Sequence, residues 1–316
     1  MKTLNILATI LFSLFSLNFC DDADLSLNDV AVKVLGQSGK IQIAKNYTSG
    51  NETTLETVTI NFSALRERDA NGADVGTAGK VKHSFNNFAT LDFNVEPVSV
   101  GKFQNLTVQT TTLTASNIVN DTRGTFIAKV VVFNESGIIE TGTNETAKVN
   151  VGALKFTVDV LDWPFCDGTV EDVESLAFCE KGQDRETGAF LDFELEIKGQ
   201  IQANKSLNSN STYELGNSEF VLSNYVKLDG GEYSQLPENY PAYERQGEKD
   251  IFTFRFPLFK TSASYDPLVV MNSVEEKTSN TWLVIGIVVG IVAIGVVIFF
   301  VLKCFNSERK PPTLLP

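Results

Sequence analysis

Three carboxylates, Asp192, Glu194 and Glu196, alternate with apolar residues in the segment AFLDFELEIKG (189–199). A period of two is typical of a β-strand with one buried face. The carboxylates then lie roughly 7 Å apart on the other face, where like charges repel unless something neutralises them. Because Ca²⁺ is a hard cation that prefers oxygen ligands, these three residues are a candidate weak calcium site. The alternative is a solvated acidic face that water and salt screen.

A second set of oxygen-bearing side chains occurs in RERDANGAD (66–74), which contains Asp69, Asn71 and Asp74. Its spacing is similar to the start of a calcium loop, but Ala73 stands at the fifth position and no glutamate closes the loop at the twelfth. Short Asp, Asn and Gly residues between two apolar runs are typical of a turn. We therefore expect a plain turn between two strands.

Patterns for nucleophilic or metal catalysis are absent from the sequence. It has no G-x-S-x-G, no H-E-x-x-H, no glycine-rich phosphate loop and no C-x-x-C, and its one histidine is His83. We therefore expect a protein that is not an enzyme and that has no cofactor beyond weakly bound Ca²⁺. The formal net charge of −13 and the pI of about 4.6 exclude nucleic acid as a principal partner, because phosphates would be repelled.

Both ends of the chain carry apolar segments. Residues 1–20 have a lysine and an apolar run before the acidic DDAD, which is the pattern of a cleaved secretory signal peptide. Residues 282–302 carry no charge, are followed by basic residues, and are long enough to cross a bilayer as one helix. We expect a single-pass type I membrane protein at the cell surface, with a stalk at 271–281 and a cytoplasmic tail at 303–316.

The predicted anchor suggests how the protein associates and how it is released. Gly286 and Gly290 form a G-x-x-x-G, which favours a homodimer through closely packed helices. The stalk at 271–281 is polar and lacks strand periodicity, so we expect it to be the place where the extracellular part is shed. Cys304 follows the apolar segment and is either a palmitoylation site or a plain reduced cysteine.

The predicted extracellular part contains one pair of cysteines, Cys166 and Cys179. In an oxidising compartment this spacing favours a disulfide that closes a local loop. A metal site is the alternative, but it would need histidine or further cysteine.

N-glycosylation sequons are concentrated in the same part of the chain, and none occurs in the predicted tail. This distribution agrees with the predicted topology. The candidate asparagines are Asn46, Asn51, Asn61, Asn105, Asn120, Asn134, Asn144, Asn204 and Asn210.

Short β-branched and aromatic stretches recur along the predicted extracellular part, with turn sequences between them. They predict an all-β ectodomain of one or two β-sandwich domains, in addition to the single C-terminal transmembrane helix. We divide it at Gly152 into an N-terminal β-sandwich domain (21–151) and an acidic C-terminal β domain (152–270), the alternative being one sheet that spans this boundary. The expected strands are 30–35, 40–45, 56–62, 88–95, 105–113, 126–133, 147–151, 153–160, 189–199, 219–226 and 250–256.

Several segments together resemble a known family. They are HSFNNFATLDF (83–93), WPFC (163–166), FLDFELEIKG (190–199), KDIFTFRFPLF (249–259) and YDPLV (265–269). In this order they are similar to the skeletal aspartic acid-rich proteins of the coral skeletal organic matrix and to their less acidic cnidarian relatives. The acidic members carry long aspartate runs, whereas the run here is only DDAD.

The resemblance implies an extracellular protein that lies in, or faces, a calcium carbonate skeleton. The expected function is therefore that of a glycosylated component of the calcifying organic matrix, with the matrix or the mineral surface as its partner. The alternative function is a cell-surface adhesion or recognition receptor, for which a sandwich, glycans and an anchor would serve equally.

Overall fold

The structure is a computed structural model that describes residues 22–27, 30–49, 52–75, 83–119, 123–141, 146–166, 180–181, 184–185, 187–199, 204–205, 212–215 and 218–271. All of them belong to one compact unit, Met1–Ser273. The predicted signal peptide, transmembrane helix and tail, and the stalk after its first residue, lie outside the described residues. Within the described residues, no helix has the length and apolar character needed to cross a membrane.

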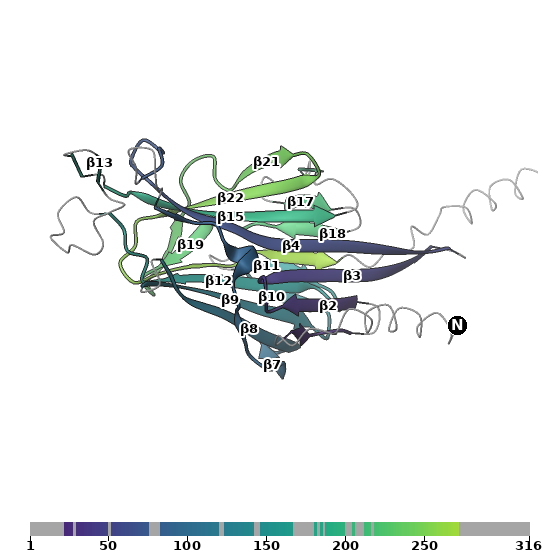
Figure 1. Ribbon diagram of the computed structural model, residues 1–316. Helices are drawn as coiled ribbons and strands as arrows, with labels where there is room; N and C mark the ends of the chain where they lie inside the picture. The colour runs from purple at the N-terminus through teal and green to yellow at the C-terminus, as the bar shows by residue number, and fades with distance from the viewer. Residues whose placement is uncertain are drawn as a thin grey trace, which may run out of the picture. The chain divides into compact units, whose positions relative to one another are not determined.

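The described chain is almost entirely antiparallel β-structure (Figure 1). One sheet, here called sheet A, has the order β1 (Ala23–Asp24), β2 (Val30–Leu35), β3 (Lys40–Ser49), β4 (Glu52–Arg68), β15 (Phe190–Gly199), β22 (Lys249–Pro257) and β21 (Ala242–Gln246), with β5 (Ser84–Phe85) beside β4.

The second sheet, sheet B, is larger. Its main path is β16 (Asn204–Lys205), β17 (Thr212–Leu215), β18 (Ser218–Val221), β24 (Leu268–Met271), β12 (Leu154–Leu161), β23 (Ser262–Tyr265), β19 (Tyr225–Leu228) and β20 (Tyr233–Gln235). From β12 it continues through β9 (Arg123–Phe133) to β8 (Leu106–Val119), which pairs with both β6 (Asn94–Val95) and β7 (Ser99–Phe103).

Three small elements complete the fold. They are the hairpin β10 (Gly137–Glu140) with β11 (Thr146–Val149), the pair β13 (Glu180–Lys181) with β14 (Asp184–Arg185), and the 3-10 helix η1 (Phe88–Thr90).

Sheets A and B pack face to face, because alternate residues of their strands meet in one continuous apolar core. Aromatic rings join the two layers: Phe62 of β4 lies 4.9 Å, between ring centroids, from Phe126 of β9. Phe254 of β22 likewise lies 4.5 Å from Tyr265 of β23. Phenylalanine side chains therefore make up much of the core of a β-sandwich, which agrees with the predicted all-β fold.

A smaller apolar cluster lies apart from the main core. It joins Val108 and Phe133 of sheet B to Ile139 and Val149 of the β10–β11 hairpin. The side-chain amide of Gln104 also donates to the carbonyl oxygen of Glu140 and accepts from its N–H, which fixes the hairpin to the turn between β7 and β8.

Gly152 does not divide the structure into two domains. In sheet A, β15 pairs with β4 and thereby joins the two sequence halves. In sheet B, β12 pairs with β9 along its whole length. The boundary between 21–151 and 152–270 is therefore wrong as a domain division, since both sheets need strands from both sides.

Most expected strands are present, but two segments differ from the expectation. The segment 88–95 is not the one continuous strand that its pattern predicts: it forms η1 and then the short β6, with Phe88 and Phe93 in the core. The segment 219–226 contains parts of two strands, because the chain leaves β18 on one side of β12 and enters β19 on the other side. In both segments the apolar residues mark burial correctly while the backbone is not continuous strand.

Candidate functional site

The acidic strand of the sequence is β15, a central strand of sheet A between β4 and β22. Its apolar residues point into the main core, as the alternation predicts. The carboxylate face, however, is not an open wet face. Asp192 is only 2% exposed and Glu196 only 8% exposed, because charged side chains of neighbouring residues cover them.

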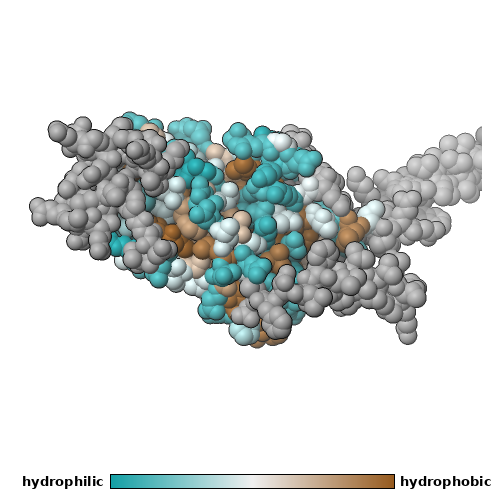
Figure 2. Space-filling model, viewed as in Figure 1, coloured by the Kyte–Doolittle hydropathy of each residue, from teal (hydrophilic) through white to brown (hydrophobic). Residues whose placement is uncertain are grey.

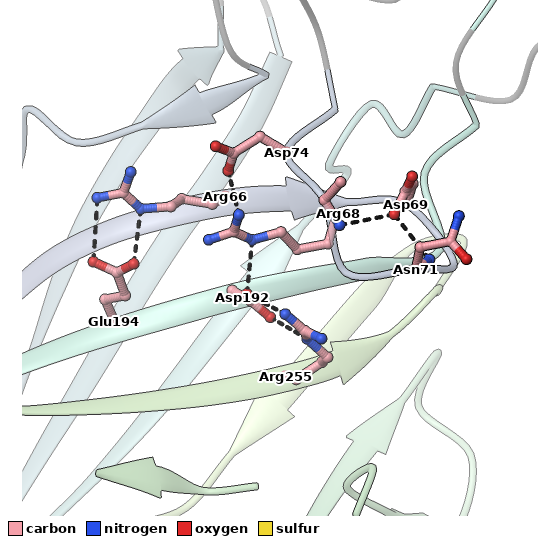
Figure 3. Close-up of polar contacts among 9 residues, drawn as sticks. Arg66, Arg68, Asp69, Asn71, Asp74, Asp192, Glu194 and Arg255 are labelled. Atoms are coloured by element: carbon pink, nitrogen blue, oxygen red, sulfur yellow. Dashed lines mark hydrogen bonds and ion pairs between the residues drawn. The ribbon is translucent and has the colours of Figure 1, made fainter. Parts of the chain in front are cut away.

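Asp192 is held between two arginines (Figure 3). Arg68 of β4 donates from Nε to Asp192 Oδ2 at 2.8 Å. Arg255 of β22 donates from Nε to Oδ1 at 2.6 Å and from Nη2 to Oδ2 at 2.7 Å. The hydrogen bonds to Asp192 raise the pKa of Arg255 against the opposing effect of burial. A two-pronged arginine–carboxylate pair of this kind is both strong and geometrically specific.

The guanidinium of Arg255 also lies against two aromatic rings and against the turn that follows β4. Its Cζ lies 4.5 Å from the ring centroid of Tyr240 and 5.4 Å from that of Phe190, which are cation–π distances. A Cβ placed on Gly72 would lie 3.1 Å from Arg255 Nη1, so the turn after β4 approaches this guanidinium closely. The position therefore suits glycine both for space and for its positive φ of 82°.

Glu194 is the middle one of the three carboxylates on β15, and it contacts Arg66 of β4. Arg66 Nη2 donates to Glu194 Oε2 at 3.3 Å. Arg66 Nε lies 2.7 Å from Oε1, an ion-pair distance at which the hydrogen-bond angle is not met. Both side chains are partly exposed, so solvent screens this ion pair.

Glu196 has three donors around its carboxylate. Lys198 Nζ lies 2.9 Å from Oε1, Lys249 Nζ lies 2.8 Å from Oε2, and Asn61 Nδ2 donates to Oε1 at 3.0 Å. Burial acts to raise the pKa of the Glu196 carboxyl, but the hydrogen bonds from Lys249, Lys198 and Asn61 outweigh it and the pKa is lowered. Glu196 is therefore held in its charged form by the protein itself.

We call this arrangement the acidic ladder: the three carboxylates of β15 together with their basic partners Arg66, Arg68, Lys198, Lys249 and Arg255. The oxygen atoms that Ca²⁺ would need already accept hydrogen bonds or ion pairs from arginine and lysine. The repulsion expected from the sequence is thus relieved within the chain. These basic partners, most of them on β4 and β22, are the site residues that the sequence reading missed.

The segment 69–74 forms the plain turn that the sequence favoured. Asp69 Oδ1 accepts from the N–H groups of Asn71 and Ala73, each at 2.8 Å. Asp74 forms an ion pair with Arg68, which extends the acidic ladder by one carboxylate (Figure 3). Asp69 therefore stabilises the turn, whereas Asp74 belongs with the ladder.

A second polar cluster, the Glu67 cluster, consists of Glu67, His83, Trp163 and Cys166, all buried. Glu67 Oε2 accepts from Trp163 Nε1 at 3.0 Å and lies 2.7 Å from His83 Nδ1, while Oε1 accepts from the Cys166 N–H at 2.8 Å. The ring of His83 stacks on the ring of Trp163, with 5.1 Å between the ring centroids.

The Glu67 cluster has the residue types of a metal site, since Glu67, His83 and Cys166 offer ligand atoms close together. Cys166 is disulfide-bonded, however, and metals bind the thiolate form of cysteine. We therefore interpret the cluster as a structural clasp between β4 and the WPFC segment. Cys179, the predicted partner of Cys166, lies outside the described residues.

The sequons differ in accessibility. Asn46 and Asn105 are exposed, Asn134 is half-buried, and Asn61 is buried with its Nδ2 on Glu196. Asn204 lies in β16. Asn51, Asn120, Asn144 and Asn210 lie outside the described residues, as do Gly286, Gly290 and Cys304.

One comparison bears on the identity of the chain. A family model described as "Acidic skeletal organic matrix protein" matches residues 18–212 and 202–300. The matched region includes both sheets, the acidic ladder and the Glu67 cluster.

Proposed function

We propose a function from one premise, that this chain belongs to the acidic skeletal organic matrix protein family. The family description supports a role in the organic matrix of a calcifying skeleton. More specifically, we propose that residues 21–270 act outside the cell as a glycosylated, non-catalytic structural component of that matrix. A helix at 282–302 holds them at the cell surface until the stalk is cleaved.

The observation that carries this proposal is the internal neutralisation of the acidic ladder. A protein that concentrates Ca²⁺ as a polyanion needs carboxylates that face solvent without cationic neighbours. Here Asp192, Glu194 and Glu196 are instead bound by arginine and lysine, in the middle of sheet A. The acidic strand therefore supports cohesion of the sheet, and this protein serves the matrix as a folded scaffold.

Contact with Ca²⁺ or with a mineral surface then falls to carboxylates outside the ladder. Exposed examples are Asp24, Asp92, Glu232, Glu238 and Glu248. They belong to different strands and turns rather than to one cage of ligands. We therefore propose weak calcium binding that is spread over the surface, in the millimolar range (roughly 10⁻⁴–10⁻³ M) of extracellular modules.

Peptide mapping of the skeleton tests this function. Skeletal mineral is cleaned oxidatively so that surface-adsorbed protein is destroyed, then dissolved, and the released peptides are identified by mass spectrometry. We expect peptides from residues 30–270 inside the mineral. Their absence, combined with detection of the same peptides in surface-labelled cell membranes, would overturn the matrix function and favour the adhesion or recognition receptor.

A further inference from the structure

Strand β7 (Ser99–Phe103) forms an edge of sheet B, where it pairs with β8 on one side only among the described strands. Its residues Ser99 to Lys102 are exposed, and Val100 is 72% exposed. Figure 1 places β7 at the lower margin of the sheet, and Figure 2 shows hydrophobic residues at the surface there. An exposed edge strand of this kind is a template for pairing with another strand.

The turn that follows β7 determines which backbone groups point outward. Gln104 and Asn105 have positive φ values of 46° and 73°, as in the two-residue type I′ turn of a hairpin. The pair that flanks such a turn, Phe103 and Leu106, is hydrogen-bonded, and the pattern alternates along the strand. The N–H and C=O groups of Val100 and Lys102 therefore point away from β8, toward solvent.

The usual protection of an edge strand is weak at β7. Lysine on an edge normally keeps other strands away. The Nζ of Lys102, however, donates to Thr107 Oγ1 at 2.7 Å and to Glu135 Oε1 at 3.4 Å, so it is drawn back over its own sheet. Other edge strands are better protected: β1 and β16 have only two residues each, and β21 carries the exposed Glu244.

We propose that β7 pairs with β7 of a second copy of this chain, antiparallel and centred on Gly101. In this register Val100 lies opposite Lys102 of the second copy, and both residues have outward backbone groups, so each of the two pairs exchanges two hydrogen bonds. The two Gly101 residues face each other at the non-hydrogen-bonded position, where Cα atoms come within about 4.5 Å. This pairing is thus symmetric about the central glycine of β7.

The surroundings of β7 fit a second copy and limit the strength of pairing. The strand carries no carboxylate, so the edge lacks the acidic character behind the net charge of −13. Pro97 lies two residues before the strand and the turn at Gln104 directly after it, so the free ladder is short. Pairing is therefore weak in dilute solution and increases where the matrix or a membrane raises the local concentration.

Cysteine cross-linking tests the proposed register in the full-length chain after enzymatic removal of N-linked glycans. Gly101→Cys is well suited, because a Cβ at this position meets nothing within 4 Å in a single copy. Val100→Cys is the matched control, since it is adjacent and highly exposed but lies opposite Lys102. We expect Gly101→Cys to form disulfide-linked dimers about tenfold faster than Val100→Cys, because only the former brings two sulfur atoms within bonding reach.

Proline provides the second measurement. Val100→Pro in the Gly101→Cys background removes an outward N–H without removing a bond to β8, so we expect native thermal unfolding and loss of the rapid cross-link. Equal cross-linking of Gly101→Cys and Val100→Cys would indicate random collision or a dimer held by the membrane helix, and would overturn the proposal. Rapid cross-linking that survives Val100→Pro in a natively folded chain would overturn it as well.

Discussion

Asn61 donates its side-chain amide to Glu196 at 3.0 Å, which joins a glycosylation sequon directly to the acidic ladder. The two residues lie opposite each other on the adjacent strands β4 and β15, and Asn61 is only 9% exposed. The nitrogen that would carry a glycan is thus the atom that contacts Glu196. Because Asn61 is buried, we expect a glycan on this nitrogen to disrupt the folded ladder.

We therefore predict that Asn61 is unmodified in the mature protein, whereas the exposed Asn46 and Asn105 are glycosylated. Deglycosylation by a glycosidase in ¹⁸O-labelled water, followed by mass spectrometry, distinguishes the sites because only formerly occupied asparagines gain the label. Labelling of Asn61 in protein that is secreted and folded would contradict the geometry of the ladder.

Loss of Asp192 should destabilise the fold strongly. Asp192→Asn keeps the shape but leaves Arg68 and Arg255 without their shared carboxylate, and breaking a buried ion pair in this way costs about 3 kcal/mol. Glu194→Gln is the matched comparison, since it removes a partly exposed pair and should cost about 1 kcal/mol or less. Chemical denaturation measures both values. Equal effects of the two substitutions would show that burial of Asp192 carries no special energetic weight.

The sequence predicted the strand and its buried face, but not the partners of its charged face. Alternation along 189–199 is a local pattern, so the order of the residues alone identifies the core side of β15. Arg68 and Arg255, by contrast, are distant in the sequence and reach Asp192 only through the strand order of sheet A. A complementary alternation was present in RER (66–68), where Arg66 and Arg68 share one face of their strand.

The same limit explains the failed division at Gly152. Its positive φ of 81° marks a turn, and a turn in a β-protein is equally typical of the space between two strands of one sandwich. Only the pairing of β4 with β15 and of β9 with β12 shows that the two halves form one unit. Long-range pairing of this kind leaves no local signal in a single sequence.

The pKa shifts of Glu196 and Asp159 have opposite signs, so we predict that the two carboxyl groups have opposite effects on how stability changes with pH. The pKa of Glu196 is lowered from its ordinary value of 4.5, so its contribution to stability is present above that value and is lost as the pH falls through the folded pKa. Burial, followed by the charge of nearby Asp266, raises the pKa of Asp159 against a hydrogen bond with Ser264. Its ionisation therefore lowers stability as the pH rises from the ordinary value of 3.8 through the folded pKa.

Unfolding free energies of Glu196→Gln and Asp159→Asn, measured from acidic to neutral pH, check these signs. Relative to the unmodified protein, Glu196→Gln should lose most stability at neutral pH and little at low pH. Asp159→Asn should be relatively more stable at neutral pH than at low pH. If both variants shift the pH profile in the same direction, the assignment of opposite roles is wrong.

If the protein is released from the membrane by cleavage, we can predict where the peptides found in mineral have their C-terminal ends. If the stalk at 271–281 is cleaved before incorporation, mass spectrometry of mineral-occluded protein should find C-terminal peptides that end within it. Peptides that continue into 282–302 would instead indicate membrane trapped during mineral growth. A chain truncated after residue 281 and expressed in calcifying cells provides the control, because it should reach the mineral without cleavage.

Calcium binding should depend on exposed carboxylates and not on the acidic ladder. Glu232 and Glu238 are exposed and lie outside the ladder, so Glu232→Gln with Glu238→Gln should lower calcium uptake by a small, graded amount. Glu194→Gln is the matched ladder variant, and it should leave calcium uptake unchanged because Arg66 already neutralises this carboxylate. Isothermal titration of the deglycosylated protein at millimolar Ca²⁺, the range of extracellular sites, compares the two. A larger loss in Glu194→Gln than in the double variant would mean that Ca²⁺ displaces the arginine and that β15 is the calcium site after all.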